Sequence, residues 1–151
     1  MGYGGAGVFR LEPNDQNLSS LLQMFFGASR EPVMVQAYLP SVRNGDKRVI
    51  LVDGEAVGAV NRIPNEGEVR SNFHVGGKAA KAGLTDRDLE ICAAIGPELR
   101  RRGLLFVGID VIGDYLTEIN VTCPTCIREL DASEGLDIAG DYLDHLERQI
   151  G

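Results

Sequence analysis

The stretch FVGIDVIGDYLTEINVT, residues 106–122, most constrains what this chain can fold into. Two apolar segments flank Gly113-Asp114, a pattern that predicts two antiparallel strands joined by a turn. Three oxygen-bearing side chains interrupt the apolar pattern, namely Asp110, Glu118 and Asn120. A buried carboxylate is costly without a partner, so this hairpin needs a chemical reason for carrying two of them.

Side chains alternate between the two faces of a strand, so Glu118 and Asn120 are expected to share a face. A three-residue loop centred on Asp114 would place Asp110 opposite Glu118. Two carboxylates this close repel each other, and a divalent cation relieves that repulsion. Mg²⁺ prefers oxygen ligands and takes its remaining ligands from water and phosphates. The pattern predicts a Mg²⁺ site, with Mn²⁺ as the alternative ion, although a solvated polar sheet face fits the strand pattern equally well.

The chain begins with a glycine-rich run, Gly2-Tyr-Gly-Gly-Ala-Gly7. Backbone N–H groups in such a run can cradle phosphate oxygens, because glycine allows close approach. No Gly-Lys-Ser/Thr follows, so the run is not a Walker loop. Either an ordinary turn or a phosphate-binding loop is consistent with it, and in the second case the contacting residues are Gly2, Gly4, Gly5 and Ala6.

The remaining pattern mixes helices with hairpins. Strands are predicted at 8–11, 34–39, 48–52 and 56–63, the last two joined by the turn Asp53-Gly54. Helical spacing is found over 18–26, 85–102 and 138–150, with a short helix at 124–130. Residues 64–84 are polar and glycine-rich, which is typical of a lid. This order favours an α+β fold with a mainly antiparallel sheet flanked by helices.

Composition excludes several classes of protein. A length of 151 residues suits one domain, and the net charge of −7 argues against nucleic acid as a partner. There is neither an apolar run long enough for a membrane span nor an export signal, so a cytoplasmic location without membrane contact is expected. Residues 41–81 carry seven basic and five acidic side chains, which suits a small anionic ligand or a solvated loop face.

Three cysteines occur, at positions 92, 123 and 126. The last two have C-x-x-C spacing, but a zinc site of this kind needs a second pair. We therefore expect the thiols to be small apolar fillers.

The run GIDVIGDYLTEINVTCPTCIREL, with GDKRVILVDGE and VQAYLP upstream, closely resembles the C-terminal ATP-grasp portion of bacterial-type glutathione synthetase. The resemblance covers nearly the whole chain. The spacing Asp-x₇-Glu-x-Asn is shared by ATP-grasp ligases generally, whereas Thr-Glu-Ile-Asn-Val-Thr-x-Pro-Thr is much more specific to glutathione synthetase.

The resemblance implies a role for each matching position. The magnesium ligands are Asp110, Glu118 and Asn120, and the segment that holds adenine contains Gln36, Tyr38 and Leu39. Asp46 and Arg48 face the nucleotide and the acyl substrate, and the arginines near the reacting phosphate are Arg62 and Arg70. The flexible lid that covers the nucleotide contains Asn72, Gly76 and Gly77. Thr125 lies near the dipeptide substrate, and Cys123 replaces a usual serine there.

The family joins glycine to γ-glutamylcysteine through an acyl phosphate, with ATP converted to ADP and phosphate, and its members form homo-oligomers. The resemblance also implies an N-terminal substrate domain and a small ATP-binding lobe with two lysines, both before Met1. Residues 1–151 are then the C-terminal portion of an ATP-grasp domain, with little turnover expected from this chain alone. The alternatives are a non-catalytic nucleotide- and metal-binding remnant, or an ATP-grasp peptide ligase with another acceptor.

Overall fold

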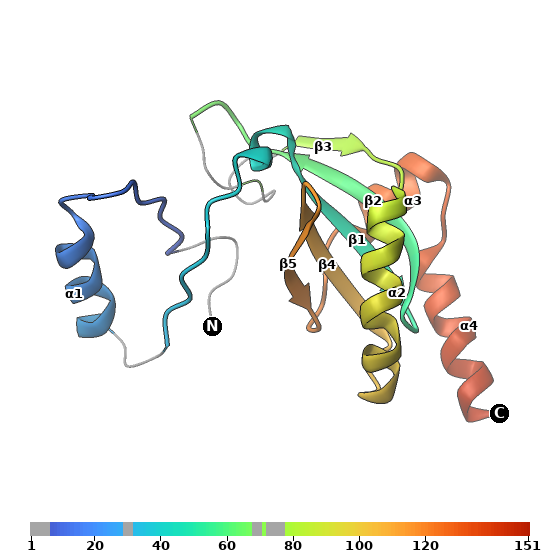
Figure 1. The fold of residues 1–151 in the computed structure, drawn as a ribbon. Helices are drawn as coiled ribbons and strands as arrows, with labels where there is room; N and C mark the ends of the chain where they lie inside the picture. Colours follow the sequence, from blue (N-terminus) through green and yellow to red (C-terminus); the bar gives the residue numbers. More distant parts are fainter. Residues whose placement is uncertain (1–6, 29–31, 68–70, 72–77) are drawn as a thin grey trace.

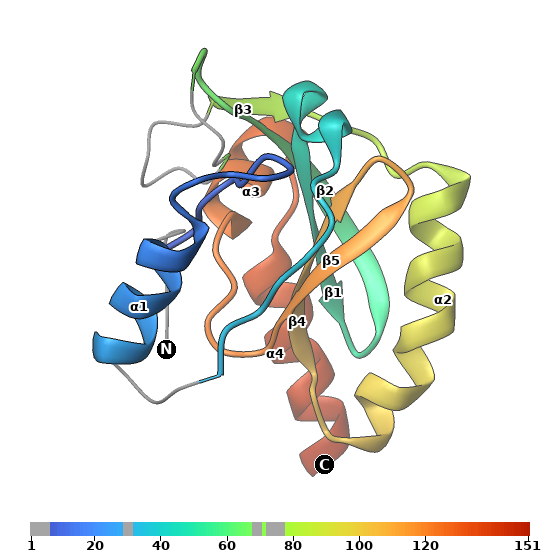
Figure 2. The same cartoon turned by 60° about the vertical axis from the view of Figure 1, so that its left-hand side comes forward.

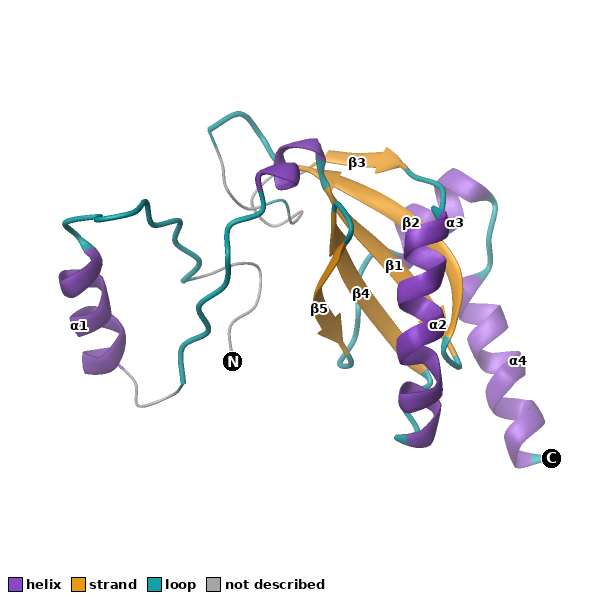
Figure 3. Ribbon diagram, viewed as in Figure 1, coloured by secondary structure: helices purple, strands orange, loops and turns teal. Residues whose placement is uncertain are grey.

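The computed structural model describes residues 7–28, 32–67, 71 and 78–151. Its strands are β1 (Asp46–Val52), β2 (Glu55–Ile63), β3 (Lys78–Lys81), β4 (Phe106–Ile112) and β5 (Tyr115–Asn120). Its helices are α1 (Leu18–Ala28), the 3₁₀ helix η1 (Pro40–Asn44), α2 (Asp86–Arg101), α3 (Ile127–Glu134) and α4 (Ile138–Ile150). Figure 1 shows the chain in sequence colours and Figure 3 its secondary structure.

The five strands form one sheet in the order β3-β2-β1-β4-β5, and every neighbouring pair is antiparallel. The α+β class predicted from the sequence is therefore confirmed, as are the two hairpins β1–β2 and β4–β5. The short strand β3 lies within residues 64–84, a segment for which no strand was predicted. Within that segment, residues 68–70 and 72–77 lie outside the described part of the chain.

Each hairpin contains a β-bulge in the strand that follows its turn. In β1–β2, Ile50 pairs with Gly58 but Leu51 pairs with Ala56, so one extra residue lies in β2. The same happens in β4–β5, where the extra residue is Thr117. The expected three-residue loop is therefore wrong, because the turn has two residues. The expected register is nevertheless present, because the bulge supplies the additional residue.

The sheet has an apolar core on each face, because successive strand residues point to opposite sides. Val49 and Leu51 pack against α2, together with side chains from β2 and β4. Ile50 and Val52 pack on the other face with residues of α3 and α4. Figures 1 and 2 show α2 on one side of the sheet and α3 and α4 on the other.

Helix α2 begins and ends where its sequence predicts. Thr85 caps the N-terminus in a reciprocal capping box with Asp88. At the C-terminus, Gly103 has a φ of +68°, and the hydrogen bonds from Gly103 N to Arg100 O and from Leu104 N to Leu99 O form a Schellman motif. The helix runs through Pro97 as one element.

The described residues 7–28 and 32–39 extend away from the sheet (Figure 1), whereas η1 lies against β2 with Val42 buried. Helix α1 confirms the predicted helix, but none of its residues is buried. The strands predicted at 8–11 and 34–39 are wrong, because both segments are irregular and neither pairs with a described strand. A β-strand needs a neighbour for its backbone hydrogen bonds. No helix in the described ranges is both long and apolar enough to cross a membrane.

Candidate functional site

A row of charged side chains crosses the sheet on the face that carries α3 and α4. Cross-strand pairing places Asp46 opposite Arg62, Arg48 opposite Asp110, and Asp110 opposite Glu118. Three members are almost completely buried, with 5% of Arg48 and 4% of both Arg62 and Asp110 exposed. We call the five paired residues the charged row, namely Asp46, Arg48, Arg62, Asp110 and Glu118. Buried charges require close partners, and the row supplies them.

Asp110 is the centre of the charged row. Arg48 makes a bidentate pair with the Asp110 carboxylate: Nε donates to Oδ1, and Nη2 donates to Oδ2 at 3.0 Å. Arg62 Nη2 lies 3.0 Å from the same Oδ1. Burial alone would raise the pKa of Asp110, but the two guanidinium groups outweigh it and hold that pKa below 3.8. The carboxylate is therefore ionised at neutral pH.

Arg62 joins Asp110 to Asp46. Its Nη2 donates to Asp46 Oδ2 at 2.7 Å, and its Nε donates to the Asp46 carbonyl oxygen at 3.3 Å. Ser71 Oγ also donates to Asp46 Oδ2, at 2.7 Å. Burial would lower the pKa of Arg62, but Asp110 and Asp46 raise it. Ser71 was missed from the sequence, because a single serine in a polar loop carries no signal of this contact.

Glu118, the last member of the charged row, and Asn120 both lie on the edge strand β5. Although much of the Glu118 side chain is exposed, partial burial raises the pKa of its carboxyl group, and the charge of Asp110 raises it further. Asn120 Nδ2 is buried without a hydrogen-bond partner in the described structure. The described residues contain no group of three or more His, Cys, Asp or Glu side chains arranged for a metal ion. Two carboxylates and an amide oxygen nevertheless suit Mg²⁺, and a cation would relieve the part of the rise in the Glu118 pKa that the charge of Asp110 adds to burial.

The loop after β5 brings Thr125 to the charged row. Arg48 Nη1 donates to Thr125 Oγ1 at 3.5 Å. Gly108 on β4 makes room for this arrangement. A Cβ atom there would lie 2.7 Å from Pro124 Cβ and 3.1 Å from Arg48 Cδ. The absence of a side chain at Gly108 therefore lets Arg48 and the loop approach β4 together.

The three cysteines are free thiols. Cys92 and Cys126 are buried in the two apolar cores, as expected of small fillers. Cys123 is exposed at a φ of +48°, so the filler interpretation is wrong for that residue. Burial raises the pKa of Cys126, which disfavours its thiolate at neutral pH.

Several residues expected at the site are not brought to the charged row by any described contact. Gln36, Tyr38 and Leu39 lie on the irregular segment that leads into η1, and the Tyr38 ring lies 4.1 Å from the guanidinium carbon of Arg10. The residues expected to bind phosphate or to form the lid lie outside the described ranges, namely Gly2, Gly4, Gly5, Ala6, Arg70, Asn72, Gly76 and Gly77.

The opposite face of β1 carries a second buried ion pair. Lys47 Nζ donates to Asp88 Oδ2, which also accepts from Thr85 N and Thr85 Oγ1 at 2.8 Å each. Burial would raise the pKa of Asp88, but these hydrogen bonds lower it below 3.8. The sequence held a signal for part of this cluster, because an acid three residues after a threonine cap predicts a capping box.

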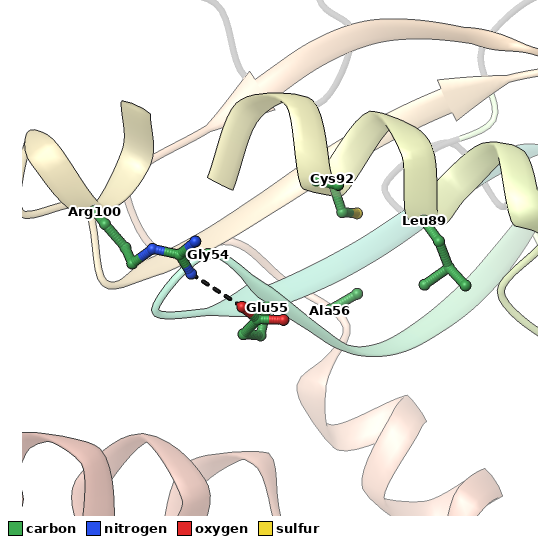
Figure 4. Close-up of a pocket in the computed structure, with 7 residues that line it drawn as sticks. Gly54, Glu55, Ala56, Leu89, Cys92 and Arg100 are labelled. Carbon is green, nitrogen blue, oxygen red and sulfur yellow. Dashed lines mark hydrogen bonds and ion pairs between the residues drawn. The ribbon is translucent and has the colours of Figure 1, made fainter. Parts of the chain in front are cut away.

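A shallow pocket of about 280 Å³ also lies on the α2 side. Figure 4 shows Cys92 and Leu89 of α2 facing Ala56, with the Arg100–Glu55 ion pair at 3.0 Å nearby. Burial, with smaller contributions from Asp88 and Glu55, raises the pKa of Cys92 to about 11. This thiol is protonated at neutral pH, and we place the candidate site at the charged row instead.

Comparison with known proteins identifies the class. The model of the prokaryotic glutathione synthetase ATP-grasp domain matches residues 1–135, so the described sheet is part of an ATP-grasp domain. The chain belongs to the prokaryotic glutathione synthetase family.

Similar relatives bear the same name. A glutathione synthetase of Mesorhizobium japonicum is 60% identical over 146 residues, covering 97% of this chain and 47% of the relative. One of Agrobacterium fabrum is 58% identical over 148 residues, covering 98% and 46%, respectively. One of Synechococcus elongatus is 53% identical over 149 residues, covering 99% and 46%. The chain thus spans about half the length of the curated relatives that it matches.

Proposed function

We propose that this chain provides the phosphoryl-transfer portion of a glutathione synthetase-like ligase. The reaction joins glycine to γ-glutamylcysteine through an acyl phosphate and converts ATP to ADP and phosphate. The observation that carries the proposal is the ionised Asp110 held between two buried arginines and opposite Glu118. This cluster lies within the segment that the family model matches.

Asp110, Glu118 and Asn120 are the proposed ligands of Mg²⁺, which Mn²⁺ could replace. When bound, the cation would offset the negative charge of the phosphates. The oxygen donors and the mutual repulsion of the two carboxylates support this assignment. The family membership supports it as well, because ATP-grasp ligases share this spacing of acid, acid and amide.

The arginines are the proposed groups that stabilise the transferring phosphoryl group and the acyl phosphate. Arg62 is held in place by Asp46, to which Ser71 also donates. Arg48 lies beside Thr125, so an anionic substrate bound there would meet a positive charge. In the proposed reaction, a carboxylate oxygen of γ-glutamylcysteine attacks the γ-phosphorus of ATP and ADP leaves. The amine of glycine then attacks the acyl carbon and phosphate leaves. Fixed positive charge favours both transition states.

The remaining assignments extend the proposal along the chain. Gly2, Gly4, Gly5 and Ala6 would bind phosphate oxygens, whereas Gln36, Tyr38 and Leu39 would hold the adenine. Arg70 would neutralise the reacting phosphate, and Asn72, Gly76 and Gly77 would form a lid that excludes water. Cys123 would contact the dipeptide beside Thr125. These roles follow from the family motifs and are proposals for this chain.

A chimera tests the proposed function in a full-length protein, because this chain spans only about half the length of its relatives. Residues 1–151 would replace the matching 47% of the Mesorhizobium japonicum relative. We expect ADP release that requires both γ-glutamylcysteine and glycine, with glutathione as the product. If the chimera folds and binds Mg²⁺–ATP but releases no ADP, the site is a non-catalytic binding module. If another amine replaces glycine, the chain comes from a different peptide ligase.

A further inference from the structure

We infer that Asp110 exchanges partners: a divalent cation that binds this carboxylate displaces Arg48, and the released guanidinium becomes available to an anionic ligand beside Thr125. The inference rests on the proposed function, because it takes the cation site from there. It goes beyond that function by coupling the binding of the cation to the binding of the substrate anion.

Asp110 is already paired with two arginines. Its Oδ1 receives donors from Arg48 Nε and from Arg62 Nη2, and its Oδ2 receives Arg48 Nη2. A carboxylate has about four lone-pair sites, so three of them are taken. A divalent cation at the same oxygens would also lie beside two guanidinium groups and be repelled by them. Asp110 therefore cannot coordinate the cation and keep all its hydrogen bonds to both arginines.

Arg48, rather than Arg62, is the arginine that Asp110 releases. Arg62 has an anchor apart from Asp110, because Asp46 accepts from its Nη2 at 2.7 Å and from its Nε at 3.3 Å. Arg48 uses two of its three donor nitrogens on Asp110. Its other described hydrogen bond is the long one to Thr125, at 3.5 Å. Arg62 therefore remains in place when Asp110 is withdrawn, whereas Arg48 loses its principal partner.

The released Arg48 guanidinium lies next to the loop that carries Thr125. Its Nη1 already points to the exposed Thr125, on the loop where Pro124 lies against Gly108. A carboxylate or phosphate oxygen bound at this loop would replace the lost carboxylate of Asp110. Binding of the cation and binding of the anion then strengthen each other, because coupling between two sites is reciprocal. Without the cation, Asp110 holds Arg48 as an internal substitute for the substrate anion.

The test follows the guanidinium itself rather than turnover. The Nε–H signals of ¹⁵N-labelled arginines in the 151-residue chain are recorded during a titration with Mg²⁺, with Arg48→Lys used to assign the Arg48 signal. We expect the Arg48 Nε–H to lose protection from solvent exchange by at least tenfold as Mg²⁺ binds. Arg62 should keep its protection. Arg100, which pairs with Glu55 on the other side of the sheet, is the internal control and should not change.

Two variants sharpen the test. In Asp110→Asn, the Arg48 signal should be unprotected before Mg²⁺ is added. Glu118 is exposed, so Glu118→Gln should fold normally, and it should move the change in the Arg48 signal to higher Mg²⁺ concentration. Binding of Mg²⁺ measured by calorimetry, with an unchanged Arg48 signal, would overturn the exchange and leave the proposed cation site intact. Absence of Mg²⁺ binding at millimolar concentration would remove both.

Discussion

Strand β1 carries two buried ion pairs at neighbouring positions, and they differ in what surrounds them. Lys47 reaches Asp88 on the α2 side, where the capping box of α2 provides the other donors to that carboxylate. Arg48 reaches Asp110 on the other side, where the neighbours are the exposed Glu118 and the exposed Thr125. We call the first the enclosed pair, because Lys47 and the α2 cap supply all the described donors to its carboxylate, whereas the second pair lies beside exposed groups that can meet a ligand.

This difference separates a structural ion pair from a functional one. Burial and charge alone do not distinguish them, because both aspartates are nearly inaccessible and both have lowered pKa values. What distinguishes Asp110 is a second carboxylate opposite it and a second arginine competing for it. We expect changes at Lys47 and Asp88 to affect mainly stability, and changes at Glu118 to affect mainly ligand binding.

At the charged row, the expected effect is on cation binding. Glu118→Gln removes a full negative charge from the proposed site and should weaken Mg²⁺ binding at least about tenfold, because unit charges about 4 Å apart near a protein surface interact by roughly 4 kcal/mol before desolvation is counted. Calorimetry of the 151-residue chain measures the change. Glu147→Gln, at an exposed position of α4, is the matched control and should bind like wild type. Equal weakening in both variants would mean that Glu118 acts only through net charge.

The enclosed pair should respond in stability instead. Asp88→Asn leaves the Lys47 ammonium without its partner and weakens the cap of α2, so we expect the free energy of unfolding to fall by about 2–3 kcal/mol. Urea unfolding followed by circular dichroism measures the loss. Asp86→Asn, at an exposed position in the same helical turn, should lose less than about 1 kcal/mol. Similar losses in the two variants would show that only the helix dipole is involved.

A smaller effect is expected from filling the space beside Arg48. Gly108→Ala places a methyl group 2.7 Å from Pro124 Cβ and 3.1 Å from Arg48 Cδ, so the loop or the arginine must shift. We expect a loss of about 1–3 kcal/mol in unfolding free energy. Gly83→Ala, with no atom within 4 Å of the added carbon, is the control and should change stability by less than about 0.5 kcal/mol. A neutral result at Gly108 would mean that the loop has another position available.

The smallest effect concerns pH and the enclosed pair. The pKa of Asp88 is lower in the folded chain than its ordinary value of 3.8, so the unfolded chain binds more protons between those two values. The contribution of Asp88 to stability is therefore fully present above pH 3.8 and is lost as pH falls through the lowered folded pKa. Unfolding curves from pH 5 to pH 2 should show a steeper loss for wild type than for Asp88→Asn. Parallel slopes would contradict the assignment of Asp88 as a paired carboxylate.

The sequence predicted the fold class and the two hairpins because their signals are local. The turn Asp53-Gly54 and the apolar segments around Gly113 lie within a few residues of the strands that they join. The bulges were not predicted, because an extra residue in a strand has no composition of its own. Without the bulge at β2, Arg62 would not pair with Asp46. The register that assembles the charged row therefore depends on a feature that appears only in three dimensions.

Predictions also failed where a segment depends on distant partners. Residues 34–39 have strand-like composition but pair with no described strand. For a similar reason, the sequence did not predict that Asp110 pairs with two arginines. The residues involved come from β1, β2 and β4, and spacing along the chain does not report which donor reaches which oxygen. Residue types predicted the chemistry of the site, whereas the structure determined the partners of its charges.

The most direct test of the central claim compares the two sides of β1 in the chimera. Glu118→Gln and Lys47→Met are each measured for the midpoint of thermal unfolding and for ADP release that depends on γ-glutamylcysteine and glycine. We predict that Glu118→Gln lowers ADP release by about 10²–10³-fold at an unchanged midpoint, because it removes a group that supports the developing charge. Lys47→Met should lower the midpoint and leave turnover per folded molecule unchanged. If Lys47→Met abolishes turnover while the chimera remains folded, or Glu118→Gln retains it, the enclosed pair and the charged row have been assigned the wrong roles.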